Sequence, residues 1–300
     1  SLDPQLLHER TRRPHAPAPI DLVSVQSQVA YGHVGNGAAI PVLHQLGLDV
    51  IEVPTTLLSN PPFYPTTRGR VLPADWLAEL PEGLAERGVH RRAGAMLSGY
   101  LASAANGDVL ADWLARHLPE APGLRHCLDP VIGDTHVGVY VEPRLEVVFR
   151  ERLLPMAWLV TPNAFELSRL AGLPTGNERE ALTAARALLE RGPTWVVAHS
   201  VPDVDGRLLT LAVSREACWK LTSPELAIDV AGTGDVFAAL VTAALLRGEP
   251  MPRVLEKATA GVHAMLEATL AVGIEELAIH AAVPAFDAGG PPRFPAVLTA

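Results

Sequence analysis

The chain has 300 residues, 48% of them hydrophobic and 19% charged, so it can bury one sizeable core. Its net charge of -9 argues against a nucleic-acid-binding surface, which normally carries a basic stripe. Its apolar runs are too short to span a bilayer and it opens without a signal-peptide pattern. We therefore expect one main domain in the cytoplasm, with no nucleic-acid or membrane partner.

The basic and sulfur-containing residues argue against several kinds of site. Lys220 and Lys257 are the two lysines, and neither follows the glycine spacing of a Walker A loop. Cys127 and Cys218 are too few for a disulfide framework, and their strand-like surroundings predict buried thiols in a reducing compartment. The eleven histidines show no paired spacing such as H-E-x-x-H, which argues against a histidine-based zinc site.

In chain order, residues 1–19 predict a flexible tail, because alternating prolines prevent a strand or a useful helix. The segment 20–285 then alternates strands with helices. We predict strands over 20–25, 48–53, 93–97, 125–128, 157–160 and 194–198, and helices over 38–46, 74–87 (interrupted near Pro81), 108–117, 143–153, 164–171 and 179–191. This alternation predicts an α/β fold with a mainly parallel central sheet flanked by helices on both faces.

Three further segments complete the predicted organisation. Residues 55–71 hold several prolines without a regular period, which is typical of a lid or a binding loop. Residues 208–213 and 218–221 predict an antiparallel pair that leads into a glycine-rich turn. From residue 286 onward the composition predicts a C-terminal tail.

The glycine-rich turn is Gly232-Thr233-Gly234-Asp235, followed by an apolar helix to residue 246 that we expect to be buried. Glycines at a helix start expose backbone N–H groups, and the helix dipole favours an anion there. A carboxylate beside an anion site is explained if Mg²⁺ offsets the repulsion and the acid accepts a proton in phosphoryl transfer. Alternatively, Asp235 caps a buried helix after a turn.

Polar residues also follow the other predicted strands, where ligands of an open parallel sheet bind. Asp129, Asp134, Glu166 and Asp235 are expected to converge at this edge. Clustered carboxylates repel one another unless a cation is present, which suggests Mg²⁺ held by Asp134 and Glu166, directly or through waters. Each acid taken singly is also explained as a helix cap or a solvated loop residue.

These residues belong to a series of motifs that resembles the pyridoxal kinases, a family of the ribokinase-like superfamily. The resemblance covers roughly residues 20–285. Its motifs are Gln26-Ser27, Tyr31-Gly32-His33-Val34-Gly35-Asn36, Ser59-Asn60, Leu97-Ser98-Gly99-Tyr100, Asp129-Pro130-Val131-Ile132-Gly133-Asp134, Thr161-Pro162-Asn163-Ala164-Phe165-Glu166 and Gly232-Thr233-Gly234-Asp235. The glycine turn alone indicates the superfamily, whereas the Gln-Ser and Tyr-Gly-His-x-Gly-Asn motifs with Ser-Gly-Tyr are specific to pyridoxal kinases.

The resemblance implies ATP-dependent phosphorylation of the 5′-hydroxyl of pyridoxal, pyridoxine or pyridoxamine, with Mg²⁺ and in some members a monovalent cation. It makes Asp235 the catalytic base and Gly232, Thr233 and Gly234 the anion hole. It assigns ATP binding to Asp129, Thr161, Asn163, Glu166, Ser200 and Tyr140, substrate binding to Ser27, Val34, Pro62 and Tyr100, and the metal to Asp134 and Glu166. Tyr140 is equally explained as a half-buried strand aromatic. The family also implies a homodimer.

The sequence departs from the family pattern at two places. Pro61-Pro62 follows Ser-Asn where family members usually have His-Thr, so two side-chain hydrogen-bonding groups are missing. Ala198 stands where some bacterial members carry a lysine near the phosphates. Two other functions stay open: another ribokinase-like kinase acting on a hydroxymethylpyrimidine or a sugar, and a non-catalytic vitamin B6 binding protein.

Overall fold

The computed structural model describes residues 17–299, which form an α/β domain around one large sheet. The predicted N-terminal tail over 1–19 lies outside the described residues, except for residues 17–19. The strands of the large sheet are β1 (Leu22–Val29), β2 (Val50–Leu58), β3 (Gly69–Val71), β4 (Ala95–Ser98), β5 (Arg125–Leu128), β8 (Leu159–Val160), β9 (Trp195–Pro202), β10 (Arg207–Val213), β11 (Cys218–Pro224) and β12 (Val297–Leu298). A small hairpin, β6 (Gly133–Asp134) and β7 (Gly138–Val139), stands apart from it.

The sheet order is β12-β11-β10-β9-β8-β5-β4-β1-β2-β3. The central strands β9, β8, β5, β4, β1 and β2 are parallel, whereas β3 at one end and β10 to β12 at the other are antiparallel. The predicted α/β class and its mainly parallel sheet are therefore confirmed. The predicted antiparallel pair is also confirmed, as β10 and β11.

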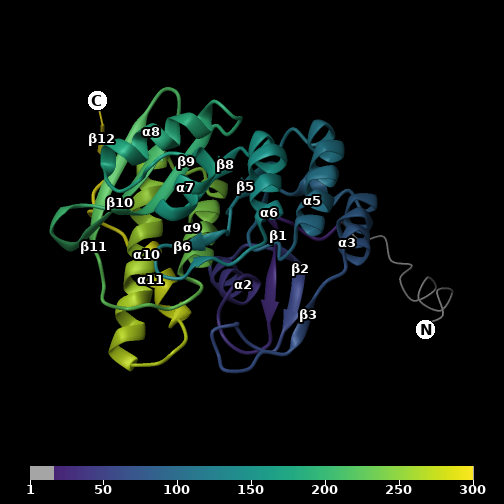
Figure 1. Ribbon diagram of the computed structural model, residues 1–300, viewed down its shortest axis with the longest axis horizontal. Coiled ribbons are helices and arrows are strands. Elements are labelled where there is room, and N and C mark those ends of the chain that lie inside the picture. Colours follow the sequence, from purple (N-terminus) through teal and green to yellow (C-terminus); the bar gives the residue numbers. More distant parts are fainter. Residues whose placement is uncertain (1–16, 300) are drawn as a thin grey trace.

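Helices cover both faces of the sheet (Figure 1). The helices are α2 (Asn36–Gln45), α3 (Ala74–Glu86), α4 (Val89–Arg92), α5 (Ala104–His117), α6 (Pro143–Val148), α7 (Ala164–Ala171), α8 (Glu178–Leu189), α9 (Thr233–Leu246), α10 (Met251–Val272) and α11 (Ala282–Phe286). Helices α3, α5, α6, α7 and α8 pack on one face. Helices α2, α9, α10 and α11 pack on the other.

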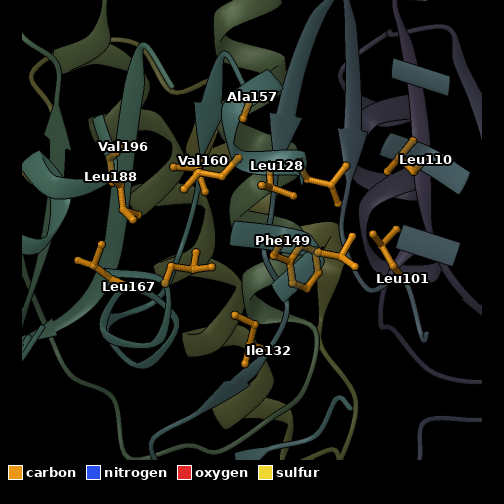
Figure 2. Packing of buried hydrophobic residues seen from close by; sticks show 14 of the residues in the cluster. Leu101, Leu110, Leu128, Ile132, Phe149, Ala157, Val160, Leu167, Leu188 and Val196 are labelled. Carbon is orange, nitrogen blue, oxygen red and sulfur yellow. The ribbon is translucent and has the colours of Figure 1, made fainter. Parts of the chain in front are cut away.

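The strands face two separate cores because successive side chains alternate between the faces of a sheet. In β5, Leu128 packs in the first cluster and Cys127 in the second. Figure 2 shows the first cluster around Phe149, which lies in a π-helical turn, Phe149–Leu153, that continues α6. The prediction that both cysteines are buried free thiols is confirmed for Cys127 and Cys218.

Helix α9 is the central helix of the second face. Every residue from Val236 to Ala244 is buried, as the apolar sequence predicts. Thr242, the polar residue in this run, donates from its hydroxyl to the carbonyl of Ala238 at 2.8 Å, so its hydroxyl does not stay unpaired in the core. The burial of α9 fixes the direction in which its N-terminus points.

Three local expectations differ from the structure. Helix α3 continues through Pro81 without interruption, because Pro81 is buried and the packing of α3 outweighs one lost backbone hydrogen bond. The segment 55–71 is a hairpin: β2 extends to Leu58, β3 pairs with it, and the irregular loop shrinks to 59–68. Strand β1 likewise extends to Val29, so Gln26 and Ser27 lie within the strand.

The C-terminal segment contacts the domain in the described residues. Phe294 is 8% exposed, and Val297 and Leu298 pair with β11 as the edge strand β12. The 22-residue helix α10 has no counterpart among the predicted elements. None of the helices in residues 17–299 combines the length and the apolar character needed to cross a bilayer.

Replacing Phe149 by Ala should lower the free energy of unfolding by about 3–5 kcal/mol, because a fully buried ring leaves a cavity in the first core. Urea unfolding followed by circular dichroism measures this loss. Phe63→Ala is the matched control, since Phe63 is 53% exposed, and it should change the free energy by less than about 1 kcal/mol. Equal losses in the two variants would contradict the assigned packing.

Candidate active site

The glycine turn before α9 forms the N-terminus of this buried helix. Gly232 has a φ of 91°, and a Cβ there would overlap the carbonyl oxygen of His33. A Cβ on Gly234 would meet open space. The first backbone N–H groups of a helix lack intrahelical partners and carry partial positive charge, so the turn can bind an anion.

Asp235 lies in the first turn of α9, and its carboxylate is held by a distant loop. Its Oδ2 accepts a hydrogen bond from the backbone N–H of Gly35 at 2.7 Å. Loss of hydration raises the pKa of Asp235 to about 6, although the N–H of Gly35 opposes the shift. A carboxyl with this pKa is ionised at neutral pH and can still take up a proton, as a general base must.

Strand β1 and the loop after it bring two predicted substrate residues to this acid. Gly35 has a φ of 54° and lies so close to Ser27 of β1 that a Cβ would overlap it. Ser27 is 6% exposed, and Val34, immediately before Gly35, is half-buried. The structure therefore gathers Ser27, Val34 and Asp235 around one glycine.

Three acids lie close enough together for their charges to raise the pKa values of Asp129 and Glu166. Burial raises the pKa of Asp129, at the end of β5, well above its usual value, and the charges of Glu166 and Asp235 add to this effect. Burial also raises the pKa of Glu166 to about 8, with Asp235 contributing. Of the four acids that we expect to converge, Asp129, Glu166 and Asp235 therefore lie close together, and Asp134 is described below.

Glu166 is fixed by backbone donors at the start of α7. Its Oε1 accepts from the N–H of Ile132 and its Oε2 from the N–H of Asn163, both at 3.0 Å. Asn163 caps the helix in return, by accepting from the N–H of Glu166 at 2.9 Å. The Asn163 amide also donates to the carbonyl of Gly133 at 2.9 Å, which joins α7 to the β6–β7 hairpin.

The hairpin carries Asp134 and, just beyond it, Tyr140. The Oδ1 of Asp134 accepts from the N–H groups of His136 and Val137 at 2.8 and 2.7 Å, which closes the hairpin turn. Tyr140 is 44% exposed, and both partial burial and the charges of Glu166, Asp134, Asp235 and Asp129 raise its pKa. Tyr140 thus borders the group of acids.

The last residues of β9 lie at the same edge of the sheet as Asn163 and Glu166. Ser200 is exposed, has a φ of 54°, and its Oγ lies 3.0 Å from Nδ1 of His199. His199 forms an isolated β-bridge with Asn163, and its ring contacts that of Phe237 of α9 in a tilted arrangement with ring centroids 4.7 Å apart. Burial lowers the pKa of His199 to about 4, so the ring is neutral. Ala198 is fully buried in the first core, which directs this position away from the open edge.

The loop 59–68 lies at the tip of the β2–β3 hairpin and is closed by its own contacts. The Asn60 amide donates to the carbonyls of Pro61 and Thr66 at 3.0 and 2.9 Å. Pro61 is buried, whereas Pro62, the predicted substrate contact, is exposed. Tyr100, after β4, is half-buried, and burial raises its pKa.

Glu276, between α10 and α11, connects this loop to the loop after β1. It accepts from the hydroxyl of Tyr64 and from the backbone N–H of His33, both at 2.7 Å. Tyr64 also contacts Tyr31 edge to face, with ring centroids 5.8 Å apart. No sequence motif indicates Glu276, because its partners are more than 200 residues away in the chain.

The oxygen donors of this edge fit a Mg²⁺ ion, which prefers carboxylates and water. Asp129 is 3% exposed, and its carboxylate has one weak contact in the described residues, 3.4 Å from the Thr161 hydroxyl. Both oxygens of Glu166 already accept backbone hydrogen bonds, so Glu166 fits a role through water better than direct ligation. Asp134 keeps its Oδ2 free of protein donors within the described part of the chain.

The chain is similar in sequence to known kinases. A family model described as phosphomethylpyrimidine kinase matches residues 91–280. A pyridoxine/pyridoxal/pyridoxamine kinase of Bordetella bronchiseptica is 40% identical over 265 residues, covering 87% of this chain and 94% of that protein. A pyridoxal kinase of Rubrobacter xylanophilus is 40% identical over 280 residues, covering 92% and 96%.

A solved structure extends the likeness to three dimensions. Pyridoxal kinase from Leishmania donovani in complex with ADP and pyridoxamine aligns with a TM-score of 0.84 and 27% identity, covering 93% of this chain and 98% of that one. The ordered motifs, the fold and these relatives lead to one assignment: the chain belongs to the pyridoxal kinase family, within the ribokinase-like superfamily.

Proposed function

We propose that this protein is an ATP-dependent kinase that transfers the γ-phosphate of ATP to the 5′-hydroxyl of pyridoxal, pyridoxine or pyridoxamine. The observation that carries the proposal is the carboxylate of Asp235, held by Gly35 at the start of α9, beside the amide turn and Ser27. Relatives named as pyridoxal kinases over most of their length support the substrate class.

In this proposal Asp235 accepts the proton of the attacking hydroxyl. Its pKa of about 6 keeps it ionised at neutral pH and close enough to neutrality for efficient proton transfer. The backbone N–H groups of Gly232, Thr233 and Gly234 donate to the transferred phosphoryl oxygens, which gain negative charge from the leaving nucleotide.

The nucleotide would lie along the loops after β5, β8 and β9. We propose Asp129, Thr161, Asn163, Glu166, Tyr140 and Ser200 as its contacts, with Asp134 and Glu166 on the side of the metal. Mg²⁺, when bound, neutralises charge on the phosphates. The buried and repelling carboxylates support a site that binds a cation, because burial and repulsion both penalise their charged forms and a bound cation offsets this penalty.

The vitamin would bind between Ser27, Val34 and Tyr100, beneath the loop 59–68. Ser27 supplies a hydroxyl for the pyridine ring, and Val34 and Tyr100 supply apolar surfaces. We propose that the buried Pro61 shapes the loop from within and that Pro62 offers only an apolar contact. The pyridine ring must then form its hydrogen bonds with residues outside this loop. This difference can change which of the three vitamers is preferred.

The match to a phosphomethylpyrimidine kinase family model favours a second candidate, phosphorylation of a hydroxymethylpyrimidine at the same site. A non-catalytic vitamin B6 carrier is the third reading, and a base beside an anion turn has no use in a carrier.

Three expectations remain proposals: a homodimer, a monovalent cation requirement, and a cytoplasmic location, which two free buried thiols support.

Purified protein with Mg²⁺-ATP should convert pyridoxal to its 5′-phosphate, measured by the absorbance of the product, and convert hydroxymethylpyrimidine more slowly.

Asp235→Asn should lower kcat by a factor on the order of 10² or more, with little change in the KM for ATP. Asp49→Asn, exposed at the start of β2, is the control and should retain activity. Turnover near normal in Asp235→Asn would remove the base from its role, and binding without turnover by wild type would favour the carrier.

Asp129→Asn should stabilise the protein in the absence of metal and nucleotide. The pKa of Asp129 is about 4 in the unfolded chain and higher in the folded protein. The carboxyl therefore lowers the free energy of unfolding at pH values above about 4, and this loss grows until pH reaches the folded pKa. The variant should therefore raise Tm by roughly 2–4 °C at pH 8 and by less at pH 5. Differential scanning calorimetry tests this, with Glu79→Gln, exposed on α3, as control; a lower Tm at pH 8 would refute it.

Glu276→Gln should weaken binding of the vitamin through the loop contacts. The amide keeps one acceptor and presents an N–H₂ group that cannot accept from His33 or Tyr64, so KM for pyridoxal should rise about tenfold. Steady-state kinetics should find the KM for ATP little changed. The exposed neighbour provides a matched control, Glu275→Gln, and identical KM values in both variants would contradict the role of Glu276.

A further inference from the structure

A group of histidines lies far from the active site in the described residues. His90 belongs to α4, which precedes β4, and His117 is the last residue of α5, which precedes β5. Glu120 ends the short 3-10 helix Leu118–Glu120. These elements enter the sheet at the amino ends of its parallel strands, whereas Asp129, Glu166 and Ser200 lie at the carboxyl ends.

We propose that His90, His117 and Glu120 form a second metal site, which binds a divalent transition metal such as Zn²⁺ at this opposite edge. Each residue offers one ligand atom, and these atoms lie within 4.8 Å of one another. Two imidazoles and a carboxylate are a donor set that suits Zn²⁺, Co²⁺ or Ni²⁺ better than Mg²⁺ or Ca²⁺.

The histidines are buried without the partners that buried imidazoles normally have. His90 is 3% exposed and the side chain of His117 is 14% exposed. All four of their ring nitrogens lack a hydrogen-bond partner in the part of the chain that the structure describes. Buried polar atoms are nearly always paired, so four unpaired nitrogens in two adjacent rings point to a ligand between them.

The geometry needs only a small adjustment to bind an ion. The ring centroids of His90 and His117 are 4.9 Å apart, and Nε2 of His90 lies 3.9 Å from Oε2 of Glu120. Ligands of a tetrahedral Zn²⁺ are about 3.4 Å apart, given bonds of about 2.0–2.1 Å. Glu120 is half-exposed, so its side chain can make this movement without disturbing the core.

The surrounding charges set the strength of the site. Arg91 contacts Glu120 at 2.8 Å and would compete with an ion for that carboxylate. Glu82 contacts Arg116 at 2.9 Å and lies 3.7 Å from Nε2 of His117, where it can supply a fourth ligand. Burial, with the nearby His117 and Arg91, lowers the pKa of His90, which keeps its ring neutral and able to bind a metal.

Occupancy of this site would connect α4 with the end of α5. His90 of α4 already contacts α5, with its ring centroid 4.9 Å from that of His117 and 6.2 Å from that of Trp113, and Arg91 of α4 contacts Glu120. A metal would therefore act on stability and not on phosphoryl transfer, because the chemistry proposed above lies at the other edge of the sheet.

Co²⁺ titration of the chelator-treated full-length protein tests the proposal, with excess Mg²⁺ present to saturate the carboxylates of the active site. Wild type should bind one Co²⁺ per chain with the visible absorption of a tetrahedral site, and Zn²⁺ should displace it and raise Tm. His117→Gln and Glu120→Gln should each lose at least tenfold in Co²⁺ affinity, and both should retain kinase activity with Mg²⁺-ATP.

His44→Gln, exposed at the end of α2, is the matched control and should bind Co²⁺ as wild type does. Calorimetry of the metal-free variants shows whether each one is folded before its affinity is compared. If wild type binds no Co²⁺, or if His117→Gln and Glu120→Gln bind it as tightly as wild type, the metal site is refuted and the cluster is an aromatic packing contact.

Discussion

The hydrogen bond from the N–H of Gly35 to the carboxylate of Asp235 is the contact on which the rest of the site depends. It joins residues 200 positions apart and holds the loop after β1 against the start of α9. A Cβ has no room at Gly35, which abuts Ser27, or at Gly232, which precedes Asp235 in the turn and abuts His33. The two glycines are thus required by close approach of backbone as well as by their positive φ.

The acids near this contact oppose folding and favour ligand binding. Asp129, Glu166 and Asp235 all have raised pKa values, because burial removes water from each carboxylate, and the charge of Asp235 adds to the shifts of Asp129 and Glu166. A cation and a nucleotide would relieve this repulsion, so the energy stored in the unliganded protein would contribute to their binding. Strain of this kind is typical of functional sites.

The parallel sheet separates two edges that carry different side chains. At the carboxyl ends, acids and glycine-rich loops gather, and Glu276 links them to the loop 59–68. At the amino ends, His90 and His117 form a buried pair. Both arrangements use the same geometric fact, that parallel strands bring loops distant in sequence to one edge.

Residue patterns alone predict the α/β class, the alternation of strands and helices, and the ordered motifs of the family, because these depend on local periodicity and on short turns. They also predict that Asp129, Asp134, Glu166 and Asp235 converge, and the charges of three of these, Asp129, Glu166 and Asp235, interact in the fold. Tertiary structure alone decided that α3 runs through Pro81, that Ser27 lies within β1, and that Glu276 contacts His33 and Tyr64. The sequence spacing argued against paired histidine ligands, and the fold brought His90 beside His117. These features depend on how whole helices and strands pack against one another. No local sequence pattern encodes that packing, so the sequence does not predict them.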